Sequence, residues 1–284
     1  MEDILRAIVL GIIQGLTEFL PISSSGHLII ARELFGWEFT DELTFDVALH
    51  LGTTAAVLIY FARDWLNMAR SGLAWMAGHR GVRSDDPATA DNRIGRAADA
   101  HVLGLVIAGS IPIAIAGFLL QDWIEDEVRS PIVASIMLIV FAFVLLAAER
   151  IGRGTRSMHE AKTSDALAIG SAQAIALIPG ISRSGITISA ALVRGLDRTS
   201  AARFSFLLST PAIGGAALLT LGEAISDGVL DDNLDIIIAG FVTSAVIGWL
   251  SIAILMKIIQ THSFLPFIIY RIAAGTFFLL YFTL

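Results

Sequence analysis

Long apolar stretches of membrane-spanning length dominate this sequence. Six of them are about 20 residues long, the length of a helix that crosses a bilayer, and they cover 43–62, 102–120, 131–148, 201–221, 236–256 and 264–284. Charged residues make up 16% of the chain, whereas a soluble domain carries about 25%. We therefore predict an all-α polytopic membrane protein in which residues 1–284 form a single membrane domain.

Composition also excludes several classes of protein. The chain has no cysteine, which argues against a disulfide scaffold and against a zinc–thiolate site. Its formal net charge of -7 argues against a nucleic-acid partner, because such proteins present a basic surface. The expected surroundings are membrane lipid.

Two further apolar stretches, 4–36 and 166–195, are broken near their middle. The breaks read L-P-I-S-S-S-G-H at 20–27 and I-P-G-I-S-R-S-G-I-T at 178–187. Proline and glycine interrupt helices, and serine favours turns and caps. Broken backbone at membrane depth is tolerated only where protein or a wet cavity covers it. We interpret each stretch as a re-entrant helical hairpin.

Basic residues predict the orientation of the chain. Most of the 19 lysines and arginines lie in loops 63–101, 149–164, 194–203 and 257–263, whereas loops 1–3, 37–42, 121–130 and 222–235 hold only Arg129 and many acids. Cytoplasmic loops carry the excess of positive charge. The first set is therefore predicted to be cytoplasmic and the second to face outward, an alternation that requires both broken stretches to be re-entrant.

The two broken stretches also align with each other at an offset of 159 residues. The shared positions include Gln14 with Gln173 and the motif I-S-x-S-G, at 22–26 and 181–185. The sequence thus predicts two pseudo-repeats, 1–150 and 160–284, within the single membrane domain. The long cytoplasmic loop 63–101 belongs to the first of them. Each half would hold one hairpin and three spans, and the odd number of spans inverts the second half.

Inverted repeats place their site near the midplane, framed by broken helices, so the two hairpin tips are expected to meet. Differences between the halves then mark the chemistry. Ser24 aligns with Arg183, Glu18 with Leu177 and His27 with Ile186. The first tip supplies an acid and an imidazole, and the second supplies a guanidinium.

Arg183 is the most informative of these residues, because an unpaired charge at membrane depth costs several kcal/mol. A guanidinium matches two phosphate oxygens at once, and the helix that starts near Ser184 points free N–H groups at an anion. The alternative is a structural salt bridge to Glu18. We expect neighbouring hydroxyls to donate hydrogen bonds to the same phosphate, namely Ser182, Ser184, Thr187, Ser23 and Ser25.

Glu18 and Gln14 lie on one helix face because they are four residues apart. A hard divalent cation would suit their oxygens, and the alternative is that Glu18 only partners Arg183. His27 is predicted to act as general acid, general base or nucleophile. Ser24 is a candidate nucleophile, a phosphate donor or a simple cap.

Other polar residues within the apolar stretches carry weaker predictions. Asp46, Ser205 and His50 lie early in the spans that follow the hairpins, and Asp46 supports the site or is only an interfacial acid. Arg271, inside the last span, is expected to pair with an acid that the sequence does not identify.

The motifs at 14–27 and 179–187 closely resemble those of the undecaprenyl-diphosphatase family, the bacitracin-resistance membrane phosphatases of bacteria. Segments 44–53, 203–211 and 263–271 also resemble it, so the similarity covers essentially the whole chain. The family's (E/Q)-x-x-x-E motif falls on Gln14 and Glu18, its histidine on His27, and its P-G-x-S-R-S-x-x-T motif on Pro179 to Thr187. Many members have glutamate in place of Gln14, which weakens a metal-binding charge there.

The resemblance implies hydrolysis of undecaprenyl diphosphate to undecaprenyl phosphate and phosphate, which recycles the lipid carrier of peptidoglycan synthesis. It further implies dependence on Mg²⁺ or Ca²⁺, an inverted-repeat fold, a homodimer, and a pocket that opens to the outer side of the bacterial plasma membrane. In the expected mechanism Arg183, Ser182 and Thr187 hold the terminal phosphate, Glu18 positions the metal, and His27 or Ser24 attacks or assists attack.

Two competing functions fit the same residues. Inverted repeats with crossed hairpins are typical of transporters, so the chain could be a flippase for a lipid phosphate that Arg183 binds without hydrolysing. A third possibility is an ion-coupled antiporter in which Glu18 carries the proton. Release of phosphate by purified protein separates the phosphatase from both.

Overall fold

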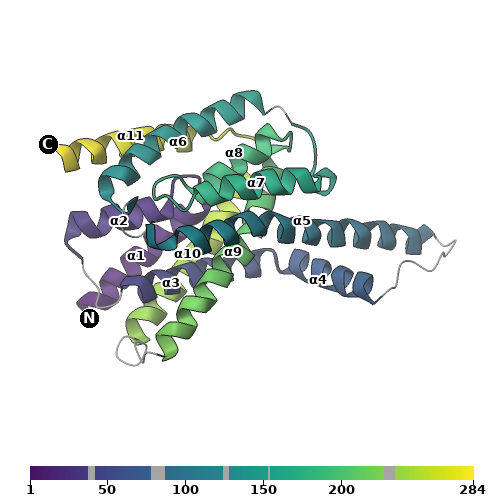
Figure 1. Ribbon diagram of the computed structural model, residues 1–284, viewed down its shortest axis with the longest axis horizontal. Helices are drawn as coiled ribbons and strands as arrows, with labels where there is room; N and C mark the ends of the chain where they lie inside the picture. Colours follow the sequence, from purple (N-terminus) through teal and green to yellow (C-terminus); the bar gives the residue numbers. More distant parts are fainter. Residues whose placement is uncertain (38–41, 78–86, 124–127, 153, 227–233) are drawn as a thin grey trace.

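The computed structural model describes residues 1–37, 42–77, 87–123, 128–152, 154–226 and 234–284. In these ranges the chain is helical and contains no strand, apart from one isolated bridge between Arg156 and Leu196. Its elements are α1 (Glu2–Phe19), α2 (Ser24–Phe35), α3 (Glu42–Tyr60), α4 (Ala62–Met76), α5 (Pro87–Trp123), α6 (Pro131–Ile151), η2 (Met158–Glu160), α7 (Thr163–Ile175), α8 (Arg183–Val193), α9 (Arg198–Ser226), α10 (Leu234–Ile258) and α11 (Leu265–Thr283). The helices pack side by side into one bundle, with α4 and the first half of α5 projecting from it (Figure 1).

Among the described residues, four helices are long and apolar enough to cross a membrane, which confirms an all-α, multi-pass membrane protein. They are Ala98–Leu120 within α5, then α6, α10 and α11. The predicted span 43–62 corresponds to α3, which bends by 76° into α4 at a short break. The predicted span 201–221 lies within α9, which contains Pro211.

Segment 63–101, which the sequence predicted as a loop, is helical over most of its described length. It holds α4 and the polar first half of α5. Residues 78–86 of this segment lie outside the described residues, as do 38–41, 124–127 and 227–233 of the predicted outer loops. Amphipathic α4 has an acid in its first turn, Asp64, which favours a helix start through the helix dipole.

Both broken stretches are pairs of helices, as predicted. The first pair is α1 and α2, and the second is α7 and α8. A serine in the left-handed region caps the second helix of each pair: Ser23 has a φ of 76° and Ser182 a φ of 74°. Each hydroxyl accepts a hydrogen bond from the backbone N–H three residues later, that of Gly26 or Gly185. Non-glycine residues with positive φ are strained and cluster at functional sites.

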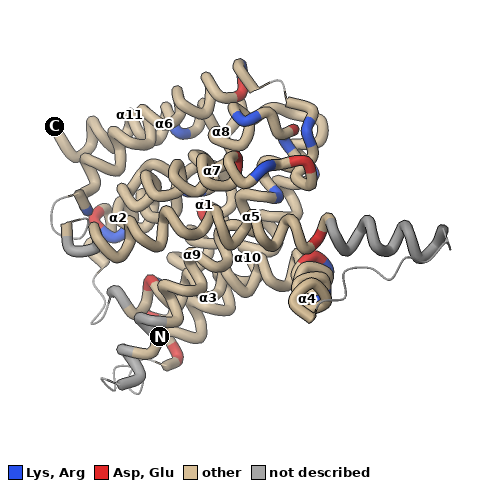
Figure 2. The backbone as a smooth tube through the Cα atoms, turned by 45° about the vertical axis from the view of Figure 1, so that its right-hand side comes forward, with Lys and Arg blue, Asp and Glu red and all other residues tan. Residues whose placement is uncertain are grey.

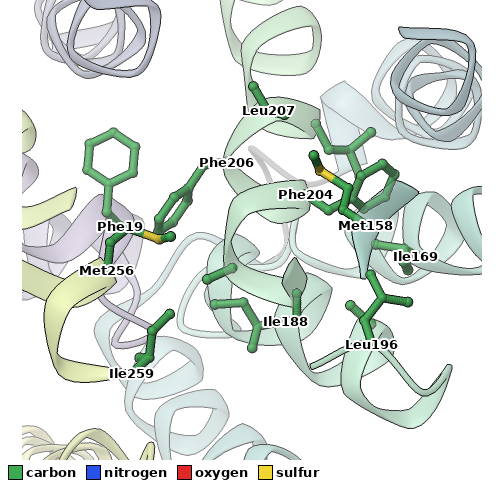
Figure 3. Close-up of a cluster of buried hydrophobic side chains, with 14 of the residues drawn as sticks. Phe19, Met158, Ile169, Ile188, Leu196, Phe204, Phe206, Leu207, Met256 and Ile259 are labelled. Carbon is green, nitrogen blue, oxygen red and sulfur yellow. The ribbon is translucent and has the colours of Figure 1, made fainter. Parts of the chain in front are cut away.

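A hydrophobic cluster anchors the end of α1 next to the break. Phe19 is 1% exposed and meets Phe206 of α9 edge to face, with ring centroids 5.4 Å apart. Figure 3 shows these two rings beside Met256 of α10, with Ile188 of α8 in the same cluster. Aromatic pairs of this geometry add to the stabilisation from burial, so α1 ends at a rigid position.

Charged residues gather mostly at two ends of the bundle, with apolar helix between them (Figure 2). At one end Arg32 and Arg129 both bond Asp46. At the other, ion pairs join Arg198 to Glu149, Arg203 to Asp64, and both Arg156 and Arg194 to Asp165. Each cluster joins segments that are far apart in the sequence.

Candidate functional site

The two breaks meet in the middle of the bundle, as the sequence predicted. A side chain on Gly26 would lie 3.2 Å from the Cα of Gly180, so the backbones are in close contact. The Ser184 hydroxyl donates to the Leu20 carbonyl across the same junction at 3.2 Å. Residues 20–26 and 180–184 thus form one junction, which we call the tip junction.

Glu18, in the last turn of α1, is the centre of the polar contacts at the tip junction. It is 5% exposed. One carboxylate oxygen accepts from the Arg183 guanidinium at 2.6 Å, and the other accepts from the Ser24 hydroxyl and from the Gln14 amide, the latter at 3.1 Å. Four residues predicted from the sequence are therefore in direct contact.

Arg183 keeps unused donors in this arrangement. Its Nε and Nη1 atoms are buried and have no hydrogen-bond partner, and its side chain is only 10% exposed. Buried N–H groups without partners are costly. The ion pair with Glu18, which was the alternative reading of Arg183, is present, but it uses one side of the guanidinium and leaves the other able to bind an anion.

The remaining predicted hydroxyls are held by the protein itself. Ser23 and Ser182 are caps, and their Oγ atoms lie 3.5 Å and 3.2 Å from those of Ser25 and Ser184. Thr187 is fully buried, where its hydroxyl contacts the Arg183 carbonyl at 2.7 Å and the Ser205 hydroxyl at 2.6 Å. Thr187 therefore braces the start of α8 against α9, and phosphate binding by these hydroxyls stays a prediction.

His27 points away from Glu18 and towards α11. Its Nδ1–H donates to the Ser23 carbonyl at 2.7 Å, which leaves Nε2 to accept from the Tyr270 hydroxyl at 2.8 Å. The two rings stack at a centroid distance of 5.7 Å. Ser24 rather than His27 is the nucleophile candidate that touches Glu18.

His50 of α3 is the site residue that the sequence did not select. Its Nδ1–H donates to the Asp46 carbonyl at 2.7 Å, and its Nε2 lies 4.0 Å from a Glu18 oxygen. The available signal was its place in the span after the first hairpin. Asp46 itself accepts bonds from Arg32 and Arg129, and so supports α2 and α3 at a distance from the guanidinium of Arg183.

Arg271 differs from its prediction. The expected acid is replaced by backbone carbonyls, because its five hydrogen bonds go to Leu138, Pro21, Met137, Gly180 and Ile181. Helix breaks leave carbonyls without intrahelical partners, and the breaks supply three of the acceptors, those of Pro21, Gly180 and Ile181. The other two, Leu138 and Met137, lie within α6.

Few side chains at the tip junction could bind a divalent cation as ligands. Among the described residues no group of three or more His, Cys, Asp or Glu side chains could enclose a metal ion. However, the amide oxygen of Gln14 is fully buried without a partner beside Glu18. Mg²⁺ is often held by one carboxylate together with substrate phosphates and water, so Gln14 and Glu18 fit a cation that arrives with its phosphate.

Comparisons with known proteins show the family of the chain. A family model described as bacitracin resistance protein BacA matches residues 7–277. Proteins named undecaprenyl-diphosphatase are similar over nearly the full chain. That of Desulforudis audaxviator is 46% identical over 95% of this chain and 94% of its own. Those of Thermodesulfovibrio yellowstonii and Elusimicrobium minutum are 42% and 45% identical, over 99% and 95% of both chains respectively.

The matched region contains both breaks and every residue of the tip junction. With such identity over almost all of its length, the chain belongs to the bacitracin resistance protein BacA family.

Proposed function

We infer that this protein is an integral membrane phosphatase that hydrolyses undecaprenyl diphosphate to undecaprenyl phosphate and inorganic phosphate. The relatives named above carry this activity in their names. The observation in this chain that supports it best is the buried, half-used guanidinium of Arg183 beside Glu18 and Ser24. A guanidinium with free N–H groups is suited to a phosphate dianion.

In the proposed mechanism the terminal phosphate of the substrate binds the free N–H groups of Arg183. The hydroxyls of Ser25, Ser23, Ser182, Ser184 and Thr187 and the amides at the start of α8 would add donors around it. Developing negative charge on the phosphoryl oxygens is then stabilised by preorganised donors, which is the main source of catalysis in phosphoryl transfer.

Ser24 is the proposed nucleophile. Its Oγ forms a bond to the terminal phosphorus while the bond from that phosphorus to the bridging oxygen breaks, and undecaprenyl phosphate leaves. The hydroxyl proton passes to Glu18, the acid to which Ser24 is hydrogen-bonded. Water then attacks the phosphoserine, the departing Ser24 Oγ takes its proton back from Glu18, and the phosphate leaves with both protons of the attacking water.

His27 is the competing nucleophile or acid–base residue. Its contact with Tyr270 rather than Glu18 supports a second role, that of a proton donor to the departing lipid phosphate. In the resting state the Tyr270 hydroxyl donates to Nε2 and orients the neutral ring, so Nε2 has to take up a proton before His27 can pass it to the leaving group.

A divalent cation, Mg²⁺ or Ca²⁺, would be held by Glu18 and the Gln14 amide oxygen together with substrate oxygens. When bound, it would neutralise phosphate charge. The residues of this chain would orient the substrate around it: Arg183 from α8, and Ser24 from α2.

The finer architecture is also part of the proposal. We place residues 1–150 and 160–284 in inverted pseudo-repeats of one re-entrant hairpin and three spans each, in the bacterial plasma membrane, with the pocket open to the outer side. The matching serine caps of the two breaks support the repeat. The lipid tail would leave sideways into the bilayer, and the protein would act as a homodimer.

The test is release of phosphate from undecaprenyl diphosphate by purified protein in detergent with Mg²⁺ or Ca²⁺. We expect turnover by the wild type and a loss of about 10²–10³-fold in each of Arg183→Ala and Glu18→Ala, which is the order that one preorganised electrostatic contact contributes to catalysis. Folded wild type that releases no phosphate, but moves undecaprenyl phosphate between leaflets of proteoliposomes, would replace this function with that of a lipid transporter.

A further inference from the structure

Arg271 is a fully buried charge whose hydrogen bonds, within the part of the chain that the structure describes, go to backbone carbonyls. Its side chain is 0% exposed, and it lies in the middle of α11, whose other residues are mostly apolar. A lone buried guanidinium is costly. A residue of this cost needs a function that an apolar side chain could not perform.

The five acceptors of Arg271 come from three separate parts of the chain. Nη1 donates to Pro21 at 3.1 Å, and Nη2 donates to Gly180 at 2.9 Å and to Ile181 at 3.0 Å. Nε and Nη2 also reach Leu138 and Met137 of α6. One planar group therefore binds both breaks and fixes them to α6.

The bonded carbonyls are close in sequence to the residues that meet at the site. Pro21 is three residues after Glu18 and three before Ser24, and Ile181 is two before Arg183. The breaks are also joined by the Ser184–Leu20 hydrogen bond, the Arg183–Glu18 ion pair and the approach of Gly26 to Gly180. A side chain on Gly185 would lie 3.2 Å from Nη1 of Arg271, so the group is enclosed by the backbone of the start of α8.

We propose that Arg271 is a positioning residue, whose guanidinium holds the two helix breaks together so that Arg183 and Ser24 both meet Glu18. It touches no substrate in this scheme. Since this role serves the phosphatase site, it rests on the function proposed above. The neighbouring Tyr270 contacts His27, so two consecutive residues of α11 set the positions of groups on both breaks.

The geometry of the side chain explains why arginine stands here. A lysine ammonium is a single point and donates three bonds at most, whereas the guanidinium fork reaches acceptors on opposite sides at once. Lysine would keep the charge but could not bond Pro21, Leu138 and Gly180 together. The breaks would then shift relative to each other, and a shift of about 1 Å can cost about 10²-fold in rate.

The experiment compares Arg271→Lys and Arg271→Gln with a matched control, Arg32→Lys. Arg32 is likewise buried, at 7% exposed, and its ion pair is with Asp46 of α3. Each purified variant is assayed for phosphate release at a temperature well below its own melting temperature, so that only folded protein contributes. We expect kcat to fall about 30- to 100-fold in both Arg271 variants with KM changed less than threefold, and to stay within about twofold in Arg32→Lys.

The outcomes are distinguishable from failure of the proposed function. Inactive wild type would reject the phosphatase itself, whereas active wild type with normal kcat in folded Arg271→Gln and Arg271→Lys would overturn the positioning role alone. If neither variant folds, Arg271 acts in folding and the proposal is also overturned. The neutral Arg271→Gln leaves no buried charge, so we expect it to fold.

Discussion

At the scale of single residues, the carboxylate of Glu18 divides its bonds between two catalytic candidates and one amide. Its contact with Ser24 makes a serine nucleophile with an adjacent base, a recurring arrangement in covalent catalysis. His27 lies in the same turn of α2 but bonds Tyr270. The two residues that the sequence left as rivals therefore have different surroundings, and their substitutions should differ in effect.

Ser24→Ala is expected to abolish turnover, with kcat reduced at least a thousandfold and substrate binding retained, because the attacking oxygen is lost. His27→Ala should lower kcat less, about 10²-fold, since it removes proton transfer to the leaving group. Phosphate release and substrate binding are measured on both. Ser135→Ala is the control, because that buried hydroxyl bonds only a carbonyl of its own helix. Equal activity of Ser24→Ala and wild type would assign the attack to His27 or to water.

Gln14→Glu should strengthen the binding of the divalent cation. The substitution replaces an unpartnered amide oxygen beside Glu18 with a charged one, and hard cations prefer carboxylate ligands. The concentration of Mg²⁺ or Ca²⁺ that gives half-maximal activity after chelation should fall severalfold. An unchanged metal dependence in Gln14→Glu would mean that position 14 does not face the cation.

The sequence predicted the residues that meet at the site better than it predicted their supports. Arg183 and Glu18 could be identified because charges are rare in apolar segments and because their repeat partners differ. His50 and the acceptors of Arg271 could not, since no spacing rule relates α3 to α1 or α11 to a carbonyl of another segment. A carbonyl has no signature in the sequence at all.

At the scale of the helices, close approach is made possible by glycine. α7 crosses α5 where Gly170 faces Gly109, and a side chain on Gly170 would lie 2.0 Å from the Gly109 carbonyl oxygen. Small residues at crossings let helices in membranes pack backbone to backbone. This crossing positions the helix that leads into the second break.

Gly170→Ala should therefore force α5 and α7 apart. Overpacking of this kind costs about 1–3 kcal/mol, and we expect a melting temperature several degrees lower in detergent. Gly104→Ala is the matched control on α5, because nothing lies within 4 Å of its added side chain. A helix gains about 1 kcal/mol when an open glycine becomes alanine, so the control should be unchanged or slightly more stable.

The N-terminus of α7 is held by Asp165, whose side chain is 1% exposed. Burial alone would raise the pKa of this carboxyl. The Lys162 amide and the guanidiniums of Arg156 and Arg194 lower it by more than burial raises it, so the net pKa lies below the ordinary 3.8. A lowered pKa in the folded state means that the carboxylate stabilises the fold above about pH 4. That stabilisation is lost as the pH falls through the folded-state value.

Asp165→Asn should accordingly lower the melting temperature at pH 7, by an amount equivalent to about 1–3 kcal/mol, because two partly exposed arginines lose their acid. At pH values below about 4, the melting temperature of the wild type should decrease and approach that of the variant. Melting curves from pH 7 to pH 2.5 test this. Parallel curves with a constant difference would show that Asp165 acts without its charge.

At the scale of the whole molecule, hydropathy predicted the apolar helices and both breaks, because lipid requires long apolar helices and proline and serine interrupt them. It gave segment 63–101 as a loop, whereas α4 and the start of α5 are helical. Hydropathy measures only whether a segment can span. An amphipathic helix such as α4 is predicted from the helical spacing of its apolar residues instead. This helix also carries exposed Leu66 and Trp75.

The two ionic ends of the bundle give a test of orientation that the cysteine-free chain makes simple. Asp235 lies in the first turn of α10 on the predicted outer side, and His159 in η2 lies on the predicted cytoplasmic side; both are exposed. In intact cells from which any outer membrane has been removed, a membrane-impermeant maleimide should label Asp235→Cys and not His159→Cys, and it should label both after the membrane is opened. The expectation follows from the basic residues, since positive loops stay in the cytoplasm. If only His159→Cys is labelled in intact cells, the orientation is the opposite of the predicted one. The end that contains Asp46, Arg32 and Arg129 would then face the cytoplasm.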